Sequence, residues 1–294
     1  MTRREVLGLL AVGGWQLTGV DAGGAPARRP PSNGNLPKIG LGTWQTFDVG
    51  SSEAARKPLA EVLSLFVQLG GRLIDSSPMY GRSEEVVGDL AASLGIRDKL
   101  YVATKVWTTG RARGIAQMED SERKLRGKVD LMQVHNLVDA ETHLETLRAW
   151  KAAGRIRAIG VTHYTSSAYP ALAAQIRRGG IDFIQVNYSL AEREAEQEIL
   201  PLARERGIAV LVNRPFGAGS LFRETRGKAL PAFAKELGST SWAELFLKFV
   251  ISHPAVTCAI PATSKAAHLR ENMNAGGGPM PDVAMRKRIA DAVG

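Results

Sequence analysis

Residues 100–105 read LYVATK, and residues 129–135 read VDLMQVH. Both stretches are short and mostly apolar, and each ends on an ionisable residue. Such a pattern is typical of a parallel strand that is buried on both faces of its sheet. Six more stretches of this kind occur in the chain, at residues 39–44, 72–75, 156–161, 183–186, 209–212 and 256–260. The sequence therefore contains eight candidate strands.

Stretches with apolar residues at helical spacing lie between these strands. They cover residues 54–69, 142–153, 166–178, 194–206 and 241–252. A further helix is expected to begin at Ser83, with Ser83 as its cap and an acidic first turn. Strand followed by helix, about every 30 residues, predicts a closed (β/α)8 barrel, the TIM-barrel fold of the α/β class. The alternative is an open doubly wound sheet, but Gly40-Leu41-Gly42 does not complete the Gly-x-Gly-x-x-Gly turn typical of it.

The length and composition fit one large globular domain. The chain has 294 residues, 44% of them hydrophobic and 23% charged, and its formal net charge is +9. The basic residues are dispersed and form no stripe with aromatic residues, so we expect no nucleic-acid partner. The single cysteine, Cys258, lies in an apolar stretch and is expected to be a buried core thiol. The five histidines show no metal-ligand spacing, so we expect no metal site.

The first 31 residues differ from the barrel domain, which is expected to occupy residues 32–294. Residues 2–7, TRREVL, resemble a twin-arginine export signal, and a short apolar segment follows at residues 6–12. Residues 25–27, APA, offer a cleavage site. This order of segments predicts a signal peptide and export to the periplasm, the alternative being an N-terminal extension on a cytoplasmic enzyme. The apolar segment is too short to span a bilayer, so we expect no stable membrane anchor.

Four ionisable residues lie at or just after the ends of three neighbouring candidate strands. Asp75, Lys105 and His135 end their strands, and Tyr80 follows Asp75 in the next loop. The carboxyl ends of barrel strands meet at one mouth, so these side chains are expected to converge. Each also has a structural interpretation, as helix cap, solvated charge, core histidine or loop anchor. Their coincidence at matching strand ends favours an active site.

These four residue types suit the reduction of a carbonyl group, which needs a hydride at carbon and a proton at oxygen. A tyrosine is a weak acid at neutral pH, and a nearby ammonium favours its phenolate and lowers its pKa. A carboxylate holds the lysine charged and in place. An imidazole orients the carbonyl and stabilises the charge that develops on its oxygen. We therefore expect Tyr80 to be the proton donor, tuned by Lys105.

Four motifs, in this order, resemble the aldo-keto reductase superfamily. They are GLGTW at residues 40–44, IDSSPMYG at 74–81, ATK at 103–105 and DLMQVH at 130–135. The resemblance extends from Leu36 to Asn272 and implies an NAD(P)H-dependent oxidoreductase that reduces aldehydes or ketones to alcohols. It also implies a catalytic tetrad of Asp75, Tyr80, Lys105 and His135.

The resemblance further implies an extended nicotinamide dinucleotide across the barrel mouth. Gln185 resembles the residue that holds the nicotinamide carboxamide. Its partners in the family are Ser-Asn, and here they are Thr162 and His163. Where the family often has Tyr-Ser-Pro-Leu, this chain has NRPF at residues 213–216, so Asn213 cannot stack on the nicotinamide as the tyrosine does.

The remaining cofactor contacts are implied by the same resemblance. Arg214 suits the pyrophosphate, next to Phe216 and the backbone of Gly217. The 2′-phosphate and adenine contacts that we expect are Thr263, Ser264, Lys265, Glu271 and Asn272. NADP(H) is the expected cofactor. NAD(H) remains an alternative, because Ala262 and His268 stand where many NADP-selective members have lysine and arginine.

The expected substrate is a medium-sized carbonyl compound. Trp44, Phe47, Met79 and Trp107 follow barrel strands near the tetrad and predict an apolar pocket. Two other functions remain open at this point. The first is a cofactor-binding barrel with a regulatory or partner-binding role and little turnover. The second is a lyase or isomerase that uses Tyr80 and Lys105 without hydride transfer.

Overall fold

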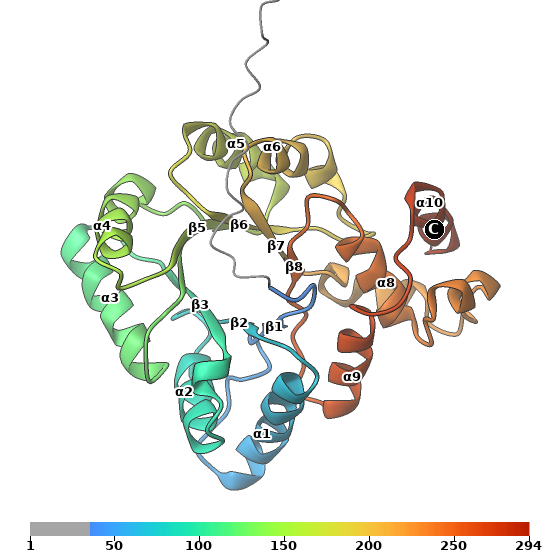
Figure 1. Cartoon of the computed structure of the whole chain (residues 1–294), viewed down its shortest axis with the longest axis horizontal. Helices are drawn as coiled ribbons and strands as arrows, with labels where there is room; N and C mark the ends of the chain where they lie inside the picture. The colour runs from blue at the N-terminus through green and yellow to red at the C-terminus, as the bar shows by residue number, and fades with distance from the viewer. Residues whose placement is uncertain (1–35, 294) are drawn as a thin grey trace, which may run out of the picture.

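The structure, a computed structural model, describes residues 36–293. Eight parallel strands form one sheet in which each strand pairs with the next along the chain (Figure 1). They are β1 (Leu41–Gly42), β2 (Leu73–Asp75), β3 (Tyr101–Val106), β4 (Leu131–His135), β5 (Ala158–His163), β6 (Phe183–Asn187), β7 (Ala209–Asn213) and β8 (Cys258–Ala259). Parallel bridges join Ile39 to Ala259 and Gly42 to Ala262, so the first strand meets the last. The predicted (β/α)8 barrel is confirmed.

Helices surround the barrel (Figure 1). They are α1 (Glu53–Gln68), α2 (Ser83–Ser93), α3 (Arg111–Lys124), α4 (Ala140–Ala152), α5 (Tyr169–Arg178), α6 (Ile199–Glu205), α7 (Ser220–Glu224), α8 (Trp242–Ile251), α9 (Ala266–Asn274) and α10 (Val283–Val293). The predicted helical stretches match α1, α2, α4, α5, α6 and α8, whereas α3, α7, α9 and α10 are not among them. In α3 only Gly114, Met118 and Ser121 are buried, which is too few to form an apolar stripe that the sequence reveals.

Short 3-10 helices divide some connections. They are η1 (Arg97–Lys99), η2 (Ser166–Ala168), η3 (Glu194–Glu196), η4 (Gly217–Gly219) and η5 (Ala232–Leu237). The predicted helices at residues 166–178 and 194–206 therefore each begin with a 3-10 turn, η2 or η3, ahead of α5 or α6. Because the two kinds of turn share nearly the same side-chain spacing, the sequence pattern does not separate them.

The start of α2 differs from the prediction. Ser83 is the first helical residue rather than the cap, and Arg82 precedes it without a side-chain capping bond. The Ser83 hydroxyl instead donates to the carbonyl oxygen of Thr43, 3.4 Å away. Ser83 therefore ties α2 to the loop after β1, and the prediction that it caps the helix is wrong.

The barrel interior has an apolar layer beneath a polar one. The apolar interior side chains are Leu73, Tyr101, Ala103, Leu131, Ala158, Phe183, Ala209, Leu211, Cys258 and Ile260. Cys258 is fully buried, as predicted, and burial raises the pKa of its thiol. Side chains alternate along a strand, so Asp75, two residues after Leu73, also points inward. The same spacing directs Lys105 and His135 into the barrel mouth.

The predicted export signal, residues 1–31, lies outside the described residues, as does the start of the predicted domain at residue 32. All eight strands lie between residues 41 and 259. Among residues 36–293, no helix is both long enough and apolar enough to cross a membrane.

Candidate active site

Asp75 and Lys105 form a buried ion pair in the barrel mouth. Lys105 Nζ lies 2.7 Å from Asp75 Oδ2 and 2.7 Å from the carbonyl oxygen of Ser76. Lys105 is fully buried, where an unpaired ammonium would be strongly disfavoured. Burial opposes its charge, but Asp75 and the phenol of Tyr80 outweigh burial and raise the pKa of Lys105. Lys105 is therefore an ammonium, as the sequence predicted.

Tyr80 lies in the loop between β2 and α2 and completes this cluster. Lys105 Nζ donates a hydrogen bond to its phenol oxygen across 3.3 Å and lies 4.7 Å from the ring centroid. Because the ammonium is the donor, the proton of the phenol remains available to a third group. Burial raises the pKa of Tyr80 above its ordinary value, although Lys105 acts to lower it. In the free protein the expectation of a lowered pKa is therefore wrong, because desolvation of the phenolate dominates.

His135 ends β4 on the opposite side of this cluster from β2. Its Nδ1 lies 2.9 Å from Oγ1 of Thr162, its register partner on β5. The ring of Trp107 meets the imidazole edge-on, with ring centroids 6.4 Å apart. Burial, together with the charges of Lys105 and His163, lowers the pKa of His135 to about 3. The imidazole is therefore neutral at ordinary pH and can act as a hydrogen-bonding group.

Two glutamine amides hold the second carboxylate oxygen of Asp75. Gln185 Nε2 donates to Asp75 Oδ1 across 2.8 Å, and Gln133 Nε2 donates to the same oxygen across 3.1 Å. These bonds favour the ionised carboxylate, which keeps Lys105 paired. Gln133 was not among the predicted site residues, although it lies two residues before His135 and so shares its inward direction.

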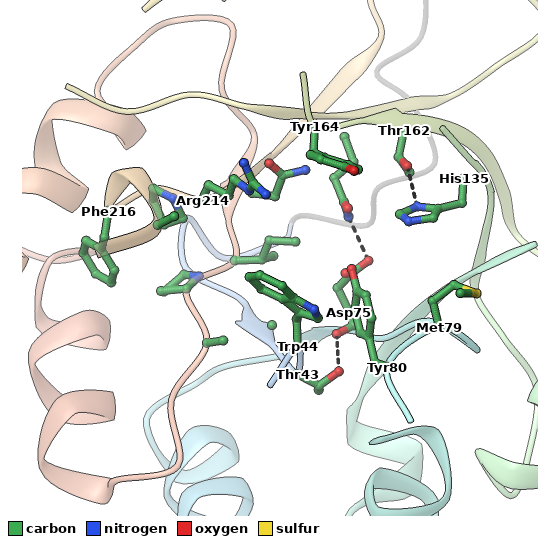
Figure 2. A pocket seen from close by; sticks show the side chains of 18 of the residues that line it. Thr43, Trp44, Asp75, Met79, Tyr80, His135, Thr162, Tyr164, Arg214 and Phe216 are labelled. Atoms are coloured by element: carbon green, nitrogen blue, oxygen red, sulfur yellow. Dashed lines mark hydrogen bonds between the residues drawn. The ribbon is translucent and has the colours of Figure 1, made fainter. Parts of the chain in front are cut away.

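A cavity of about 430 Å³ opens above the cluster. Tyr80, His135 and the predicted pocket residues Trp44 and Met79 line it (Figure 2). Trp107, also predicted, is part of the lining as well. Phe47, also expected in the pocket, is fully buried and is not part of the lining, so that prediction is wrong. Ala218 and Gly219, whose backbone was expected with that of Gly217 at the pyrophosphate, also line it. The lining further includes residues that were not predicted as contacts: Gly42, Thr43, Asn136, Tyr164, Pro215, Ile260, Pro261 and Ala262.

The side of the cavity at β5–β7 carries most of the predicted nicotinamide contacts. Thr162, Gln185, Asn213, Arg214 and Phe216 all line it. With its Nε2 donating to Asp75, Gln185 keeps its amide oxygen for a ligand donor. The amide oxygen of Asn213 is buried and has no hydrogen-bond partner among the described residues. Such an orphaned polar atom fits a site that a polar ligand completes.

Two predicted contacts lie elsewhere. His163 is not part of the cavity lining, and its Nδ1 accepts from the backbone N–H of Thr165 across 3.3 Å. Gly217 also lies off the lining, whereas Ala218 and Gly219 lie on it. The guanidinium of Arg214 lies 4.8 Å from the ring centroid of Tyr164, so the two side chains meet across the β5 and β7 sides of the mouth (Figure 2).

The predicted adenosine contacts follow the cavity wall along the chain. Ile260, Pro261 and Ala262 line the cavity, and residues 263–265 lead directly from them into α9. Within this turn, Thr263 Oγ1 accepts from the backbone N–H of Lys265 across 3.1 Å. None of Thr263, Ser264, Lys265, Glu271 and Asn272 is part of the lining. Asn272 is buried in α9 and Lys265 is exposed.

Comparison with known families agrees with this geometry. The model of the Aldo/keto reductase family matches residues 38–287. The chain belongs to the aldo/keto reductase family. The resemblance found in the sequence is thereby confirmed, and the tetrad that it implied coincides with the cluster of Asp75, Tyr80, Lys105 and His135 at the cavity.

Individual relatives extend this finding. Methylglyoxal reductase YeaE from Escherichia coli is 30% identical to this aldo/keto reductase, over 81% of this chain and 84% of its own length. Aldo-keto reductase YhdN from Bacillus subtilis is 34% identical, but the match spans 60% of this chain and 57% of that relative. The crystal structure of an aldo/keto reductase from Klebsiella pneumoniae in complex with NADP and acetate superposes with a TM-score of 0.75. It is 27% identical and covers 88% of this chain and 92% of its own.

Proposed function

We propose that this aldo/keto reductase reduces aldehydes or ketones to alcohols with NADPH. One observation carries the proposal. The ammonium of Lys105 donates to the phenol oxygen of Tyr80 at 3.3 Å, which leaves the phenol proton free at a cavity that His135 also lines. A carbonyl oxygen placed between Tyr80 and His135 would find a proton donor and a hydrogen-bonding imidazole. The nicotinamide, when bound, supplies the hydride.

The chain's own residues divide the remaining work. Tyr80 gives its proton to the oxygen as it becomes an alcohol oxygen, a contribution of about 10²–10⁴-fold for general acids. Lys105 stabilises the phenolate left behind, since its ammonium already donates to that oxygen. Asp75 keeps Lys105 charged and in place across 2.7 Å. His135 orients the carbonyl oxygen and stabilises its developing charge.

NADP(H) is the proposed cofactor, with NAD(H) as the alternative. The Klebsiella pneumoniae relative was solved with NADP, and a second structure was solved with NADPH. We propose that Arg214 meets the pyrophosphate and that Thr263, Ser264 and Lys265 meet the 2′-phosphate. A guanidinium suits paired phosphate charges, and an exposed lysine at the start of α9 suits an additional phosphate. Glu271 and Asn272 on α9 are proposed to contact the adenine.

The proposed substrate is a medium-sized aldehyde or ketone with apolar surroundings at its carbonyl. Four of the large apolar side chains that are exposed among the described residues line the cavity: Trp44, Met79, Trp107 and Tyr164. Exposed apolar groups gathered in a cavity favour a small-molecule site over a surface that binds a protein partner. Methylglyoxal reductase YeaE, whose name states a small carbonyl substrate, is one relative.

We also propose that the chain is exported in folded form through a twin-arginine signal at residues 1–31. The support is the order of Arg3-Arg4, the apolar segment and the APA site at residues 25–27. All eight strands lie after this segment, between residues 41 and 259. Cell fractionation of wild type and of the double variant Arg3→Lys, Arg4→Lys tests the proposal. Periplasmic protein that disappears in the variant is expected, and equal cytoplasmic retention of both would contradict it.

A direct assay tests the reductase proposal. Purified protein is mixed with NADPH or NADH, and the nicotinamide absorbance is followed while aldehydes and ketones are added. Carbonyl-dependent oxidation, faster with NADPH, is the expected result. Binding of cofactor without turnover would instead support a cofactor-binding barrel, and absence of binding would remove the proposed site.

A further inference from the structure

Thr162 makes a contact that a role in cofactor binding does not use. It lies on β5 and lines the cavity, at a position that the family resemblance assigns to the nicotinamide. Its hydroxyl, however, is hydrogen-bonded to Nδ1 of His135 across 2.9 Å (Figure 2). Thr162 is only 1% exposed, so its hydroxyl depends on protein partners rather than on bulk water.

The partners of this hydroxyl decide which nitrogen of His135 carries the proton. The backbone N–H of Asn136 lies 3.4 Å from Thr162 Oγ1 and can act only as a donor. The hydroxyl has one proton of its own, and Nδ1 of His135 is the acceptor placed next to it. With a proton on Nδ1, the oxygen would receive two donors, and its own proton would have no acceptor among the contacts of the described residues. With the proton on Nε2, the Asn136 N–H donates to the hydroxyl of Thr162, and that hydroxyl donates to Nδ1 of His135, so each of these groups has a partner.

The turn after His135 holds this arrangement in place. Asn136 and Leu137 adopt left-handed φ angles of 52° and 57°, which non-glycine residues seldom adopt and which are concentrated at functional sites. Asp139, also left-handed, accepts a hydrogen bond from the backbone N–H of Gly110 across 2.7 Å. The loop before Gly110 carries Trp107, whose ring packs edge-on against His135. The imidazole is therefore hydrogen-bonded to Thr162 at one nitrogen and packs in a T-shaped arrangement with Trp107.

We propose that Thr162 is a positioning residue that holds His135 as its Nε2–H tautomer. Nε2 is then a donor at the cavity that Tyr80 also lines. A carbonyl oxygen needs donors, because an acceptor nitrogen would repel its lone pairs as negative charge develops. The catalytic consequence rests on the proposed reductase function, whereas the tautomer is a property of the protein alone.

The test compares wild type with Thr162→Val and Thr162→Ser. Valine keeps the branched shape that suits a strand but lacks the hydroxyl, and serine restores the hydroxyl. Thr146→Val is the matched control, because it removes a buried hydroxyl on α4 that donates to the carbonyl oxygen of Thr142. Nitrogen NMR of histidine-labelled protein without cofactor reports the tautomer, and the His135 signals are those that disappear in His135→Gln. Steady-state kinetics and NADPH titration by fluorescence accompany it.

Wild type, Thr162→Ser and Thr146→Val are expected to show the Nε2–H tautomer, and Thr162→Val a mixture of the two. In Thr162→Val, kcat should fall by roughly 10- to 100-fold, with NADPH affinity nearly unchanged, because one oxyanion donor is misplaced. An Nδ1–H tautomer in wild type would overturn the proposal. So would unchanged His135 signals in Thr162→Val combined with weakened NADPH binding, which would make Thr162 a cofactor contact. The expected tautomers with no carbonyl reduction by any variant would uphold the positioning and reject the proposed function.

Discussion

The two sides of the cavity mouth are built in different ways. On the β2–β4 side, the charged groups Asp75 and Lys105 are paired, although the amide oxygens of Gln133 and Asn136 are buried with no partner among the described residues. Asp75 accepts hydrogen bonds from Lys105 of β3 and from Gln133 of β4, and Gln185 reaches the same carboxylate from β6. On the β7 side, the chain turns through left-handed conformations at Arg214 and at residues 217–219. There the amide oxygen of Asn213 is buried with no partner among the described residues.

We propose that the β2–β4 side carries the chemistry and that the β7 side binds the cofactor. Strand ends fix the direction of a side chain, so the protein itself holds the proposed catalytic groups in place. The β7 segment places Asn213, Arg214 and Phe216 along the cavity, and the amide oxygen of Asn213 has no partner among the described residues. Changes on the first side should therefore affect kcat and stability, and changes on the second side should affect cofactor affinity.

The largest effect, on both stability and activity, is expected from Lys105→Met. This change removes the cation of the buried Asp75–Lys105 ion pair. It leaves the buried Asp75 carboxylate without a cation, which typically costs about 3–5 kcal/mol of unfolding free energy. Activity should also disappear. Chemical denaturation and turnover assays measure both effects. The control is Lys248→Met, which removes another buried lysine whose ammonium bonds carbonyl oxygens at Gly277 and Pro279. Lys248→Met should lower stability and leave kcat intact. If Lys248→Met lost as much kcat as Lys105→Met, the proposed separation of a catalytic side from the rest of the protein would be contradicted.

Tyr80→Phe should lower kcat by about 10²–10⁴-fold, because it removes the proton donor and little volume. NADPH affinity should hardly change. Tyr101→Phe is the matched control, since Tyr101 lies in the barrel interior with a buried hydroxyl that has no partner among the described residues. It should keep full activity and equal or greater stability. An active Tyr80→Phe enzyme would remove Tyr80 from the chemistry.

Arg214→Ala probes the binding side and should weaken NADPH binding by roughly tenfold, with kcat at saturating cofactor little changed. The control is Arg155→Ala, because Arg155 also stacks on an aromatic ring, that of Trp150 at 3.6 Å, but does not line the cavity. Asn213→Tyr should strengthen binding by a few-fold if an aromatic ring can stack there. Fluorescence titration measures all three, and an unchanged Kd in Arg214→Ala would contradict the proposed pyrophosphate contact.

The smallest effect is expected from pH. His135, with a pKa of about 3, is neutral above that value, and Tyr80, with a pKa raised above 10, keeps its proton below it. Carbonyl reduction, measured as kcat/KM, should therefore be nearly flat from about pH 5 to 9 and fall only in alkali. A decline centred between about pH 6 and 8 would mean that an ordinary histidine controls the rate.

Sequence patterns predicted that Asp75, Lys105 and His135 converge at the barrel mouth, because strand periodicity determines side-chain direction. Asp75, Lys105 and His135 each lie an even number of residues after an apolar interior residue of the same strand, so they point inward as well. The same rule predicts that Gln133 points inward. The β7 side was harder to predict. The sequence of residues 213–217 does not indicate that Arg214 meets Tyr164 or that Gly217 lies outside the cavity lining. The polar helix α3 was also not predicted, because it buries too few residues to show a helical period of apolar positions.

The central claim is that hydride passes from a nicotinamide to a carbonyl carbon at this cavity while Tyr80 supplies the proton. The most direct test uses NADPH deuterated on one face of its nicotinamide C4, with an aldehyde that the enzyme reduces, and mass spectrometry of the alcohol. One deuterium on the carbinol carbon, from one face of the cofactor only and at a rate that collapses in Tyr80→Phe, is the predicted result. Cofactor oxidation without deuterium in the alcohol, or a rate unchanged in Tyr80→Phe, would contradict the account.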